Sequence, residues 1–392
     1  MKKFGRFLLL FLIFLAGGTA VFFFLFAAQK VKRKEAAEIT QLKINKANTL
    51  QLAAKAKNVI LLIGDGMGLA QVSAGMAINN NQLQLERCTT VGLSKTTAAN
   101  RYITDSASAA TAMSSGKKTN NGAIAVTPDQ VATETILEMA EKQGMSTGLI
   151  ATSKITHATP AAFIAHEKNR ESYEAIAADF LETEVDVVIG GGMKNFAQRE
   201  DERNLIDELK KLGYEIFESM ESLLQSDSKK LYALCAEEDM PTMIEGRGDF
   251  LGNAIQTAIA RLSQNEKGFF LMAESSQIDW GGHDNNADYV ITEMLDFDQS
   301  IGQVLDFAAQ DSQTLVIITA DHETGGLSIT DYDQELKEFD LKFSTFGHTP
   351  IMIPVYAYGP GSEAFTGIYE NTEIFFKMVQ ALGLNTKQAN SD

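Results

Sequence analysis

Short apolar runs alternate with amphipathic segments along most of this chain. Five of the runs are rich in β-branched residues, at 58–64, 147–151, 185–191, 268–274 and 314–320. They are apolar on both faces and separated by helix-like segments, which is typical of buried parallel strands covered by helices on both sides. The pattern therefore predicts an α/β protein, a three-layer α/β/α sandwich around a central, mostly parallel sheet.

Two of the intervening segments have the features of helices. Residues 287–310 place apolar side chains at helical spacing and predict a long amphipathic helix. A second helix is expected over 127–144, with Thr127 as its cap, Pro128 at the first position, Gln130 completing a capping box and Gly144 at its end. The charged stretch 196–246 is helix-prone and is interpreted as a peripheral excursion.

The first 34 residues differ in character from the rest. Residues 7–28 carry no charge, and at about 1.5 Å per residue they would span roughly 33 Å, close to the thickness of a bilayer core. The length favours a membrane anchor over a cleaved signal peptide, whose apolar region is shorter. The domain prediction is an anchor or signal segment at 1–34, a stalk at 35–56 and one folded body at 57–392.

The charge balance excludes one class of partner. The chain has 34 basic and 51 acidic residues, and seven of the basic residues but no acidic ones lie in 1–34, so the remainder has a net charge of −24. A body this acidic is a poor candidate for nucleic-acid binding, which depends on neutralising phosphates with Lys and Arg. If the substrate is an anion, a local positive charge is needed, and metal ions would provide it.

Acidic residues follow three of the apolar runs at their carboxyl ends. Asp65, Glu274 and Asp321 occupy these positions. Ligands of open α/β sheets bind beyond the carboxyl ends of the strands, so the three side chains should converge. Clustered carboxylates repel one another unless cations lie between them. Asp65 and Glu274, with a hydroxyl such as Thr159, form an all-oxygen set that suits Mg²⁺.

The histidines support a metal site, whereas the cysteines do not. His283 follows Asp279 by four residues, His322 is adjacent to Asp321, and His348 lies in a Gly- and Pro-flanked loop. Imidazole together with carboxylate suits zinc. The two cysteines, at positions 88 and 235, lack metal-ligand spacing. Whether they pair with each other is left open, because the sequence does not show whether they approach.

The stretch TDSASAATAMSSG, at 104–116, has two interpretations. Thr104 or Asp105 can simply cap a helix rich in small residues. Alternatively Ser106 is a nucleophile at a helix N-terminus, where the backbone favours an anion. The stretch alone favours the cap, but the candidate metal ligands elsewhere favour the nucleophile. Because no histidine neighbours Ser106 in sequence, metal activation fits it better than a general base.

Taken together, several motifs resemble the alkaline phosphatase family. They are NVILLIGDGMG, TDSASAATA, NNGAIAV, HATPAAFIAHEKNR, AESSQIDWGGHDN, ADHETGG, GHT and IPVYAYGPG, and they follow the family order over about 57–375. The resemblance implies two zinc ions and one magnesium ion. The first zinc would be held by Asp279, His283 and His348, the second by Asp65, Asp321 and His322, and the magnesium by Asp65, Thr159 and Glu274.

The resemblance also assigns the residues that act on substrate. Ser106 would be the nucleophile that forms a phosphoserine intermediate, and Arg170 would clamp two phosphate oxygens. His157 and Trp280 stand at positions that vary within the family, close to the metals and phosphate. Both are therefore expected to bind substrate and to tune the rate and phosphate release.

The resulting functional prediction is a metal-dependent phosphomonoesterase that acts on small phosphate monoesters. The rivals are a phosphodiesterase on the same fold and an inactive, anchored binding protein. The resemblance also favours a location outside the cytoplasm, either periplasmic or at the cell surface, with the membrane reached through the N-terminal segment. A homodimer, common in the family, is left open.

Overall fold

The computed structural model describes residues 55–333 and 338–384. The predicted anchor or signal segment at 1–34, and nearly all of the predicted stalk, lie outside these residues. Within the described ranges, no helix combines the length and apolarity needed to cross a membrane.

A ten-stranded sheet forms the centre of the described chain. Its order is β14-β2-β13-β8-β1-β7-β3-β4-β6-β5. The strands are β1 (Asn58–Gly64), β2 (Thr90–Lys95), β3 (Ser146–Lys154), β4 (Val187–Gly191), β5 (Glu215–Phe217), β6 (Leu231–Leu234), β7 (Phe269–Ser275), β8 (Thr314–Thr319), β13 (Ile353–Tyr358) and β14 (Gly367–Glu370). All neighbouring pairs are parallel except those of β13, which runs antiparallel to β2 and β8. The expected mostly parallel sheet and its five predicted strands are confirmed.

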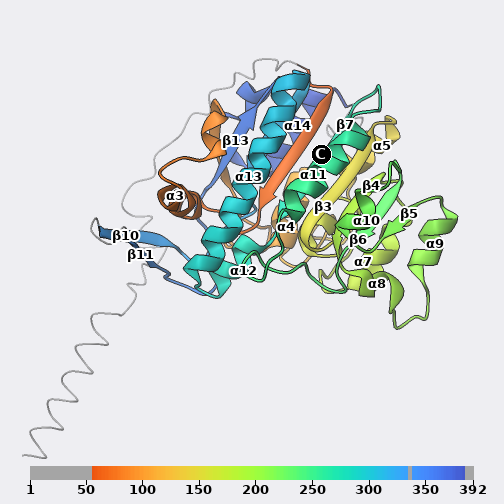
Figure 1. Ribbon diagram of the computed structural model, residues 1–392, viewed down its shortest axis with the longest axis horizontal. Coiled ribbons are helices and arrows are strands. Elements are labelled where there is room, and N and C mark those ends of the chain that lie inside the picture. Colours follow the sequence, from red (N-terminus) through yellow and green to blue (C-terminus); the bar gives the residue numbers. More distant parts are fainter. Residues whose placement is uncertain (1–54, 334–337, 385–392) are drawn as a thin grey trace, which may run out of the picture. The chain divides into compact units, whose positions relative to one another are not determined.

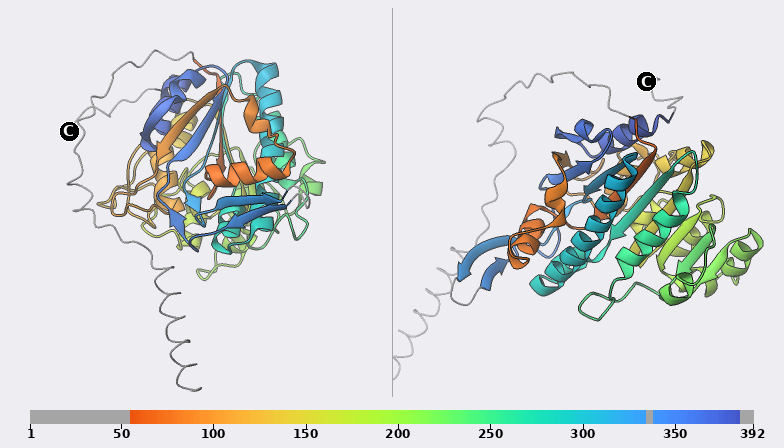
Figure 2. Two further views of the ribbon diagram at one scale, coloured as in Figure 1. Left: turned by 90° about the vertical axis from the view of Figure 1, so that its left-hand side faces the viewer. Right: turned by 45° about the horizontal axis from the view of Figure 1, so that its top comes forward.

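Helices cover both faces of this sheet, as the alternating pattern predicts. On one face lie α3 (Leu69–Ile78), α11 (Phe250–Leu262) and α13 (Ala287–Asp311), which pack on the side chains of one apolar cluster. On the other face a second cluster includes residues of α4 (Ser106–Ser115), α5 (Ile136–Lys142), α6 (Ala158–Ala161), α7 (Tyr173–Asp179) and α14 (Thr372–Leu382). Figure 1 looks onto α11 and α13, and Figure 2 shows the layers from two other sides.

The long helix α13 matches the predicted amphipathic segment. Asn286 caps it, accepting a hydrogen bond from the backbone N–H of Tyr289. Its buried face packs against α11, α12 (Gln277–His283) and β8. Two small pairs of strands lie outside the main sheet: β9 (Glu323–Thr324) with β12 (His348–Thr349), and β10 (Ser328–Asp333) with β11 (Glu338–Lys342).

The prediction of a helix over 127–144 is wrong for its first half. Thr127 instead closes a tight turn, in which its hydroxyl accepts from Val131 N and Gln130 adopts φ of 65°. The helix begins eight residues later at a second capping box, where the Thr135 hydroxyl accepts from Glu138 N and the Glu138 carboxylate accepts from Thr135 N. The two caps look alike in sequence, and apolar packing of the segment after Thr135 selects the second.

The interpretation of 196–246 as a helix-prone excursion is incomplete. The segment does contain α9 (Leu205–Lys211) and α10 (Met220–Leu223), but it also supplies β5 and β6, which extend the main sheet. β6 is fully buried, and its four residues, LYAL, are too short a run to be separated from a helix by period. The remaining short helices are α8 (Met193–Ala197) and the 3₁₀ helices at Gln84–Arg87 and Ser362–Phe365. Both cysteines are free.

Candidate active site

Neighbouring strands bring the acidic residues together. β8, β1 and β7 lie side by side and parallel at the centre of the sheet. Asp65 follows β1, Glu274 is the penultimate residue of β7, and Asp321 and His322 follow β8. All four side chains are buried. The convergence expected at the carboxyl edge of the sheet is therefore observed.

Both interpretations of the segment around Ser106 describe part of the structure. Asp105 is the cap of α4, and its carboxylate accepts from Ser108 N at 3.0 Å. Ser106 is the first residue of that helix and is 2% exposed. Its Oγ lies 3.4 Å from Nε2 of His322. The cap thus places the serine hydroxyl against the cluster of ligand-type side chains.

A first cluster consists of Asp279, His283 and His348. Helix α12 places Asp279 and His283 one turn apart, and β12 contributes His348. The Nδ1 atom of His283 donates to Phe346 O at 2.6 Å, and that of His348 donates to Thr104 O at 2.9 Å. Each neutral ring therefore keeps a lone pair on Nε2.

These two Nε2 atoms lie 3.1 Å apart, with the Asp279 carboxylate 3.4 Å from one and 3.5 Å from the other. Two lone pairs at this separation repel unless a proton or a cation lies between them. The contact with Asp279 raises the pKa of His283 to about 9, so the ring can hold that proton. This is the arrangement of ligands expected at a zinc site.

A second cluster joins Asp65, Asp279 and His322, with Asp321 beside them. Nε2 of His322 lies 3.1 Å from Asp321 Oδ2 and 3.7 Å from Asp65 Oδ1. Both Asp65 oxygens and Oδ2 of Asp321 are buried without a hydrogen-bond partner among the described residues. Buried carboxylate oxygens normally have hydrogen-bond partners, so these oxygens are positioned to bind a group that is not part of the protein, such as a metal ion.

A third cluster contains Asp65, His157 and Glu274. Oε2 of Glu274 accepts from Ser276 Oγ at 2.6 Å, whereas its Oε1 and the Thr159 hydroxyl oxygen are buried and unpartnered among the described residues. The sequence predicted Asp65, Thr159 and Glu274 as the oxygen ligands here. The structure adds His157, whose ring reaches the same cluster.

The electrostatics of these clusters fit divalent cations. Burial raises the pKa of Asp65 well above its usual range, that of Asp321 to about 6 and that of Glu274 to about 7. Neighbouring carboxylates raise the Asp65 and Asp321 values further. Burial also acts to raise the pKa of Asp279, but its contacts with His283 and the other histidines hold it below the usual value. Cations would neutralise the first three groups and supply the partners that their oxygens lack.

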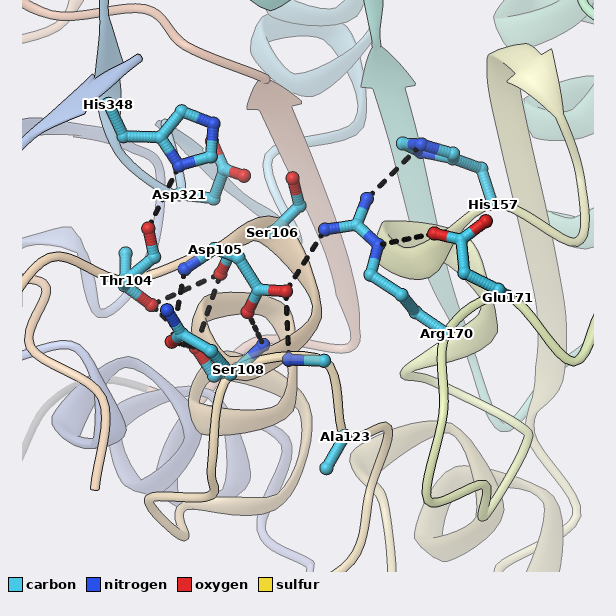
Figure 3. A network of polar contacts seen from close by, with 12 residues as sticks. Thr104, Asp105, Ser106, Ser108, Ala123, His157, Arg170, Glu171, Asp321 and His348 are labelled. Carbon is cyan, nitrogen blue, oxygen red and sulfur yellow. Dashed lines mark hydrogen bonds and ion pairs between the residues drawn. The ribbon is translucent and has the colours of Figure 1, made fainter. Parts of the chain in front are cut away.

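Arg170 lies beside Ser106, and its guanidinium contacts Asp105, His157 and, more distantly, Glu171, whose Oε1 lies 3.9 Å from Nε (Figure 3). Nη1 donates to Asp105 Oδ2 at 3.1 Å, and Nη2 donates to Nε2 of His157 at 3.2 Å. Burial, together with the charge of Arg170, lowers the pKa of His157 to about 3, so its ring is neutral and accepts this bond. Trp280 packs edge-on to His157, with ring centroids 6.2 Å apart.

Comparisons with known proteins agree with this geometry. The family model described as alkaline phosphatase matches residues 56–340. The chain is 36% identical over 424 residues to alkaline phosphatase 3 of Bacillus subtilis, an alignment that covers 84% of this chain and 90% of the relative. The chain belongs to the alkaline phosphatase family. Its homologues show that it is a phosphomonoesterase, a hydrolase.

Solved alkaline phosphatase structures show the same fold. The enzyme from the Antarctic bacterium TAB5 superposes with a TM-score of 0.82 at 45% identity, covering 85% of this chain and all of that one. The cold-active enzyme from Shewanella sp. gives 0.78 at 33% identity, covering 83% and 99%. A variant of the TAB5 alkaline phosphatase, solved with Mg bound in a site termed M3, gives 0.81 at 44% identity and covers 85% and 100%.

The sequence interpretation of this alkaline phosphatase missed two residues near the reaction centre. Asp105 was interpreted only as a helix cap, yet the same carboxylate also holds Arg170 and accepts from Gly122 N at 2.8 Å. The Thr324 hydroxyl donates to Asp279 and lies 3.2 Å from Nδ1 of His322. The Asp-Ser pair is a usable signal for Asp105, whereas Thr324 lies in the motif ADHETGG, which by itself does not indicate contacts with Asp279 and His322.

Proposed function

We propose that this alkaline phosphatase hydrolyses small phosphate monoesters through a phosphoserine intermediate on Ser106. Its site would hold two zinc ions and one magnesium ion. The observation that supports the proposal most strongly is the set of buried, unpartnered ligand oxygens on Asp65, Glu274 and Asp321, clustered near a serine that begins a helix.

The chemistry of the donor atoms decides which of them suit zinc and which suit magnesium. Asp279, His283 and His348 form a mixed imidazole and carboxylate set that suits one zinc ion. Asp65 and Asp321, which both lie near Nε2 of His322, form a second such set with that histidine. The oxygens of Asp65, Thr159 and Glu274 suit magnesium. When bound, such ions neutralise charge on the entering, leaving and equatorial oxygens and lower the pKa of nearby hydroxyls.

The remaining steps depend on side chains of the chain itself. Ser106 Oγ attacks phosphorus, and the bond from phosphorus to the leaving oxygen breaks. Water then hydrolyses the seryl phosphate and releases inorganic phosphate. The N-terminus of α4 directs backbone N–H groups toward the developing negative charge. Arg170, oriented by Asp105 and His157, offers its remaining N–H groups to two phosphate oxygens.

The cellular setting is proposed from the N-terminal sequence and the family. The uncharged span at 7–28 supports export with attachment to the membrane, and thus action outside the cytoplasm. A topology reporter fused after residue 392 tests this, because reporter activity on the cytoplasmic side would contradict it. The homodimer stays a prediction.

The catalytic proposal is tested with the purified full-length chain in detergent, supplied with zinc and magnesium. The rates on p-nitrophenyl phosphate and bis(p-nitrophenyl) phosphate are compared for wild type, Ser106→Ala and the control Ser73→Ala, an exposed serine of α3. We expect a dominant monoester rate that is lost only in Ser106→Ala. A dominant diester rate would identify a phosphodiesterase, and a fully active Ser106→Ala would exclude the serine intermediate.

A further inference from the structure

Glu323 is a buried carboxylate that lies next to the metal-ligand cluster but is not part of it. It directly follows His322, is 2% exposed, and belongs to none of the three clusters. Its Oε1 accepts from Gln71 Nε2 at 2.7 Å and from Leu327 N at 3.1 Å. Its Oε2 accepts from Gly326 N at 3.2 Å and from the Thr349 hydroxyl. Four donors from three segments, the turn at Gly326 and Leu327, helix α3 and strand β12, therefore meet on one side chain.

The segments that meet at Glu323 carry candidate ligands. Strand β9 follows His322, and strand β12 contains His348. The two strands pair over two residues each, with His348 opposite Thr324 and Thr349 opposite Glu323. Strands in proteins are usually longer than this. A ladder of two residue pairs therefore fixes the register of the two strands only weakly on its own. The side-chain bond from Thr349 to Glu323 crosslinks the same two strands.

Gln71 extends this network to the loop that carries Asp65. Its Nε2 donates to Glu323 and also to Thr324 O at 2.8 Å, while its Oε1 accepts from Gly68 N at 3.1 Å. Gln71 is fully buried in the first turn of α3. The turn after β1, the turn after β8 and strand β12 are therefore all tied to a single pair of buried side chains.

The backbone around Glu323 is shaped to admit its side chain. A Cβ atom on Gly68 would lie 2.4 Å from Cγ of Glu323 and 2.9 Å from Oε1 of Gln71. Only a glycine leaves room for both side chains at that point. The close approach shows that the position of Glu323 is set by packing as well as by hydrogen bonds.

We propose that Glu323, together with Gln71 and Thr349, is a positioning group that sets the distance between His322 and His348 for metal binding. The inference rests on the proposed function for the identity of the ions, but on the described contacts for the geometry. Residues that orient metal ligands typically change metal affinity by 10- to 100-fold when they are removed. Neither Glu323 nor its partners needs to touch the substrate or the reacting atoms.

The matched pair Thr349→Val and Thr349→Ser tests the crosslink. Valine keeps the shape but loses the hydroxyl, whereas serine keeps the hydroxyl. Zinc dissociation constants are measured by chelator competition, and kcat and KM are measured separately on p-nitrophenyl phosphate. We expect Thr349→Val to weaken the binding of at least one zinc by tenfold or more, with kcat falling more than KM changes. Thr349→Ser should restore the zinc affinity to within about threefold of wild type.

Glu323→Gln gives an independent test with nearly the same volume. Each carboxylate oxygen accepts from one backbone N–H, at Gly326 or Leu327. In either orientation, the glutamine amide therefore places its NH₂ group against a backbone N–H. Both groups are donors, and the backbone N–H cannot act as an acceptor. The control is Thr257→Val, a buried threonine of α11, which should leave zinc affinity and kinetics unchanged.

Folding is followed by circular dichroism and gel filtration, so that loss of structure is not mistaken for loss of metal. If Thr349→Val does not fold, Gln71→Met replaces it with the same expected loss of zinc affinity. Folded variants that bind zinc as wild type does would overturn the positioning role and leave the proposed function intact. A wild-type chain that binds no zinc and hydrolyses no monoester would overturn both.

Discussion

Replacing Arg170 with lysine separates the charge of this residue from its shape. The guanidinium has five N–H donors, and in the structure Nη1 uses one on Asp105 and Nη2 uses one on His157. One further N–H remains on each terminal nitrogen, and Figure 3 shows the group turned toward Ser106. These two donors have the spacing that matches two phosphate oxygens.

The expected loss follows from the missing second donor. A lysine ammonium keeps the positive charge but is a point donor, and it cannot bind Asp105, His157 and two phosphate oxygens with fixed geometry. A hydrogen bond to a charged group contributes about 1.5–3 kcal/mol. Since about 1.4 kcal/mol corresponds to a factor of ten, Arg170→Lys should lower kcat/KM by about 10- to 150-fold.

The assay compares kcat/KM for p-nitrophenyl phosphate, and the inhibition constant of inorganic phosphate, between wild type and Arg170→Lys. Arg203→Lys is the control, because the exposed Arg203 side chain pairs with Glu208 on the surface. In Arg170→Lys, kcat/KM should fall and the inhibition constant of phosphate should rise, whereas both should stay unchanged in the control. A kcat/KM within twofold of wild type for Arg170→Lys would refute the two-oxygen clamp.

Three further predictions concern metals and pH. Because burial raises the pKa of Asp321 to about 6 and that of Glu274 to about 7, these two carboxyls bind more protons in the folded metal-free protein than in the unfolded chain. Their contribution to stability should therefore fall as pH rises from about 4 to 7, so Glu274→Gln should raise the melting temperature of the metal-free protein more at pH 7 than at pH 4; an equal effect at both pH values would contradict the assignment. His157→Asp makes the third cluster all-oxygen, so the magnesium concentration for half-maximal activity should drop about tenfold, and an unchanged value would place His157 outside the metal site. Bonding to Glu138 raises the pKa of His166, so its stabilising contribution is present below about pH 6.5 and is lost as pH rises through the folded value. His166→Gln should accordingly lower the melting temperature more at pH 6 than at pH 9, and an equal loss at both would argue against this pair.

Much of the fold and the positions of the acidic residues could be predicted from the sequence. The central strands are apolar on both faces, and this pattern has few alternatives to a covered parallel sheet. Once β1, β7 and β8 are parallel neighbours, Asp65, Glu274 and Asp321 must meet at one edge. The helix α13 was predictable for a similar reason, because 25 residues give the helical period many repeats.

The parts that could not be predicted depend on contacts distant in sequence. Thr127 and Thr135 carry similar capping signals, and tertiary packing decides between them. Strands β5 and β6 have only three and four residues, too few for a period to appear. Gln71 lies 252 residues before Glu323, so the local sequence around either residue does not predict their hydrogen bond.

The central claim is that Ser106 becomes phosphorylated during turnover. The full-length enzyme, loaded with zinc and magnesium, is mixed with p-nitrophenyl phosphate and quenched in acid within milliseconds, and its peptides are then analysed by mass spectrometry. We predict a phosphate on the peptide 102–117 at Ser106, absent from Ser106→Ala, that disappears when substrate is exhausted. Full turnover with no phosphate on Ser106 at any quench time, or the same phosphopeptide yield from Ser106→Ala, would contradict the account.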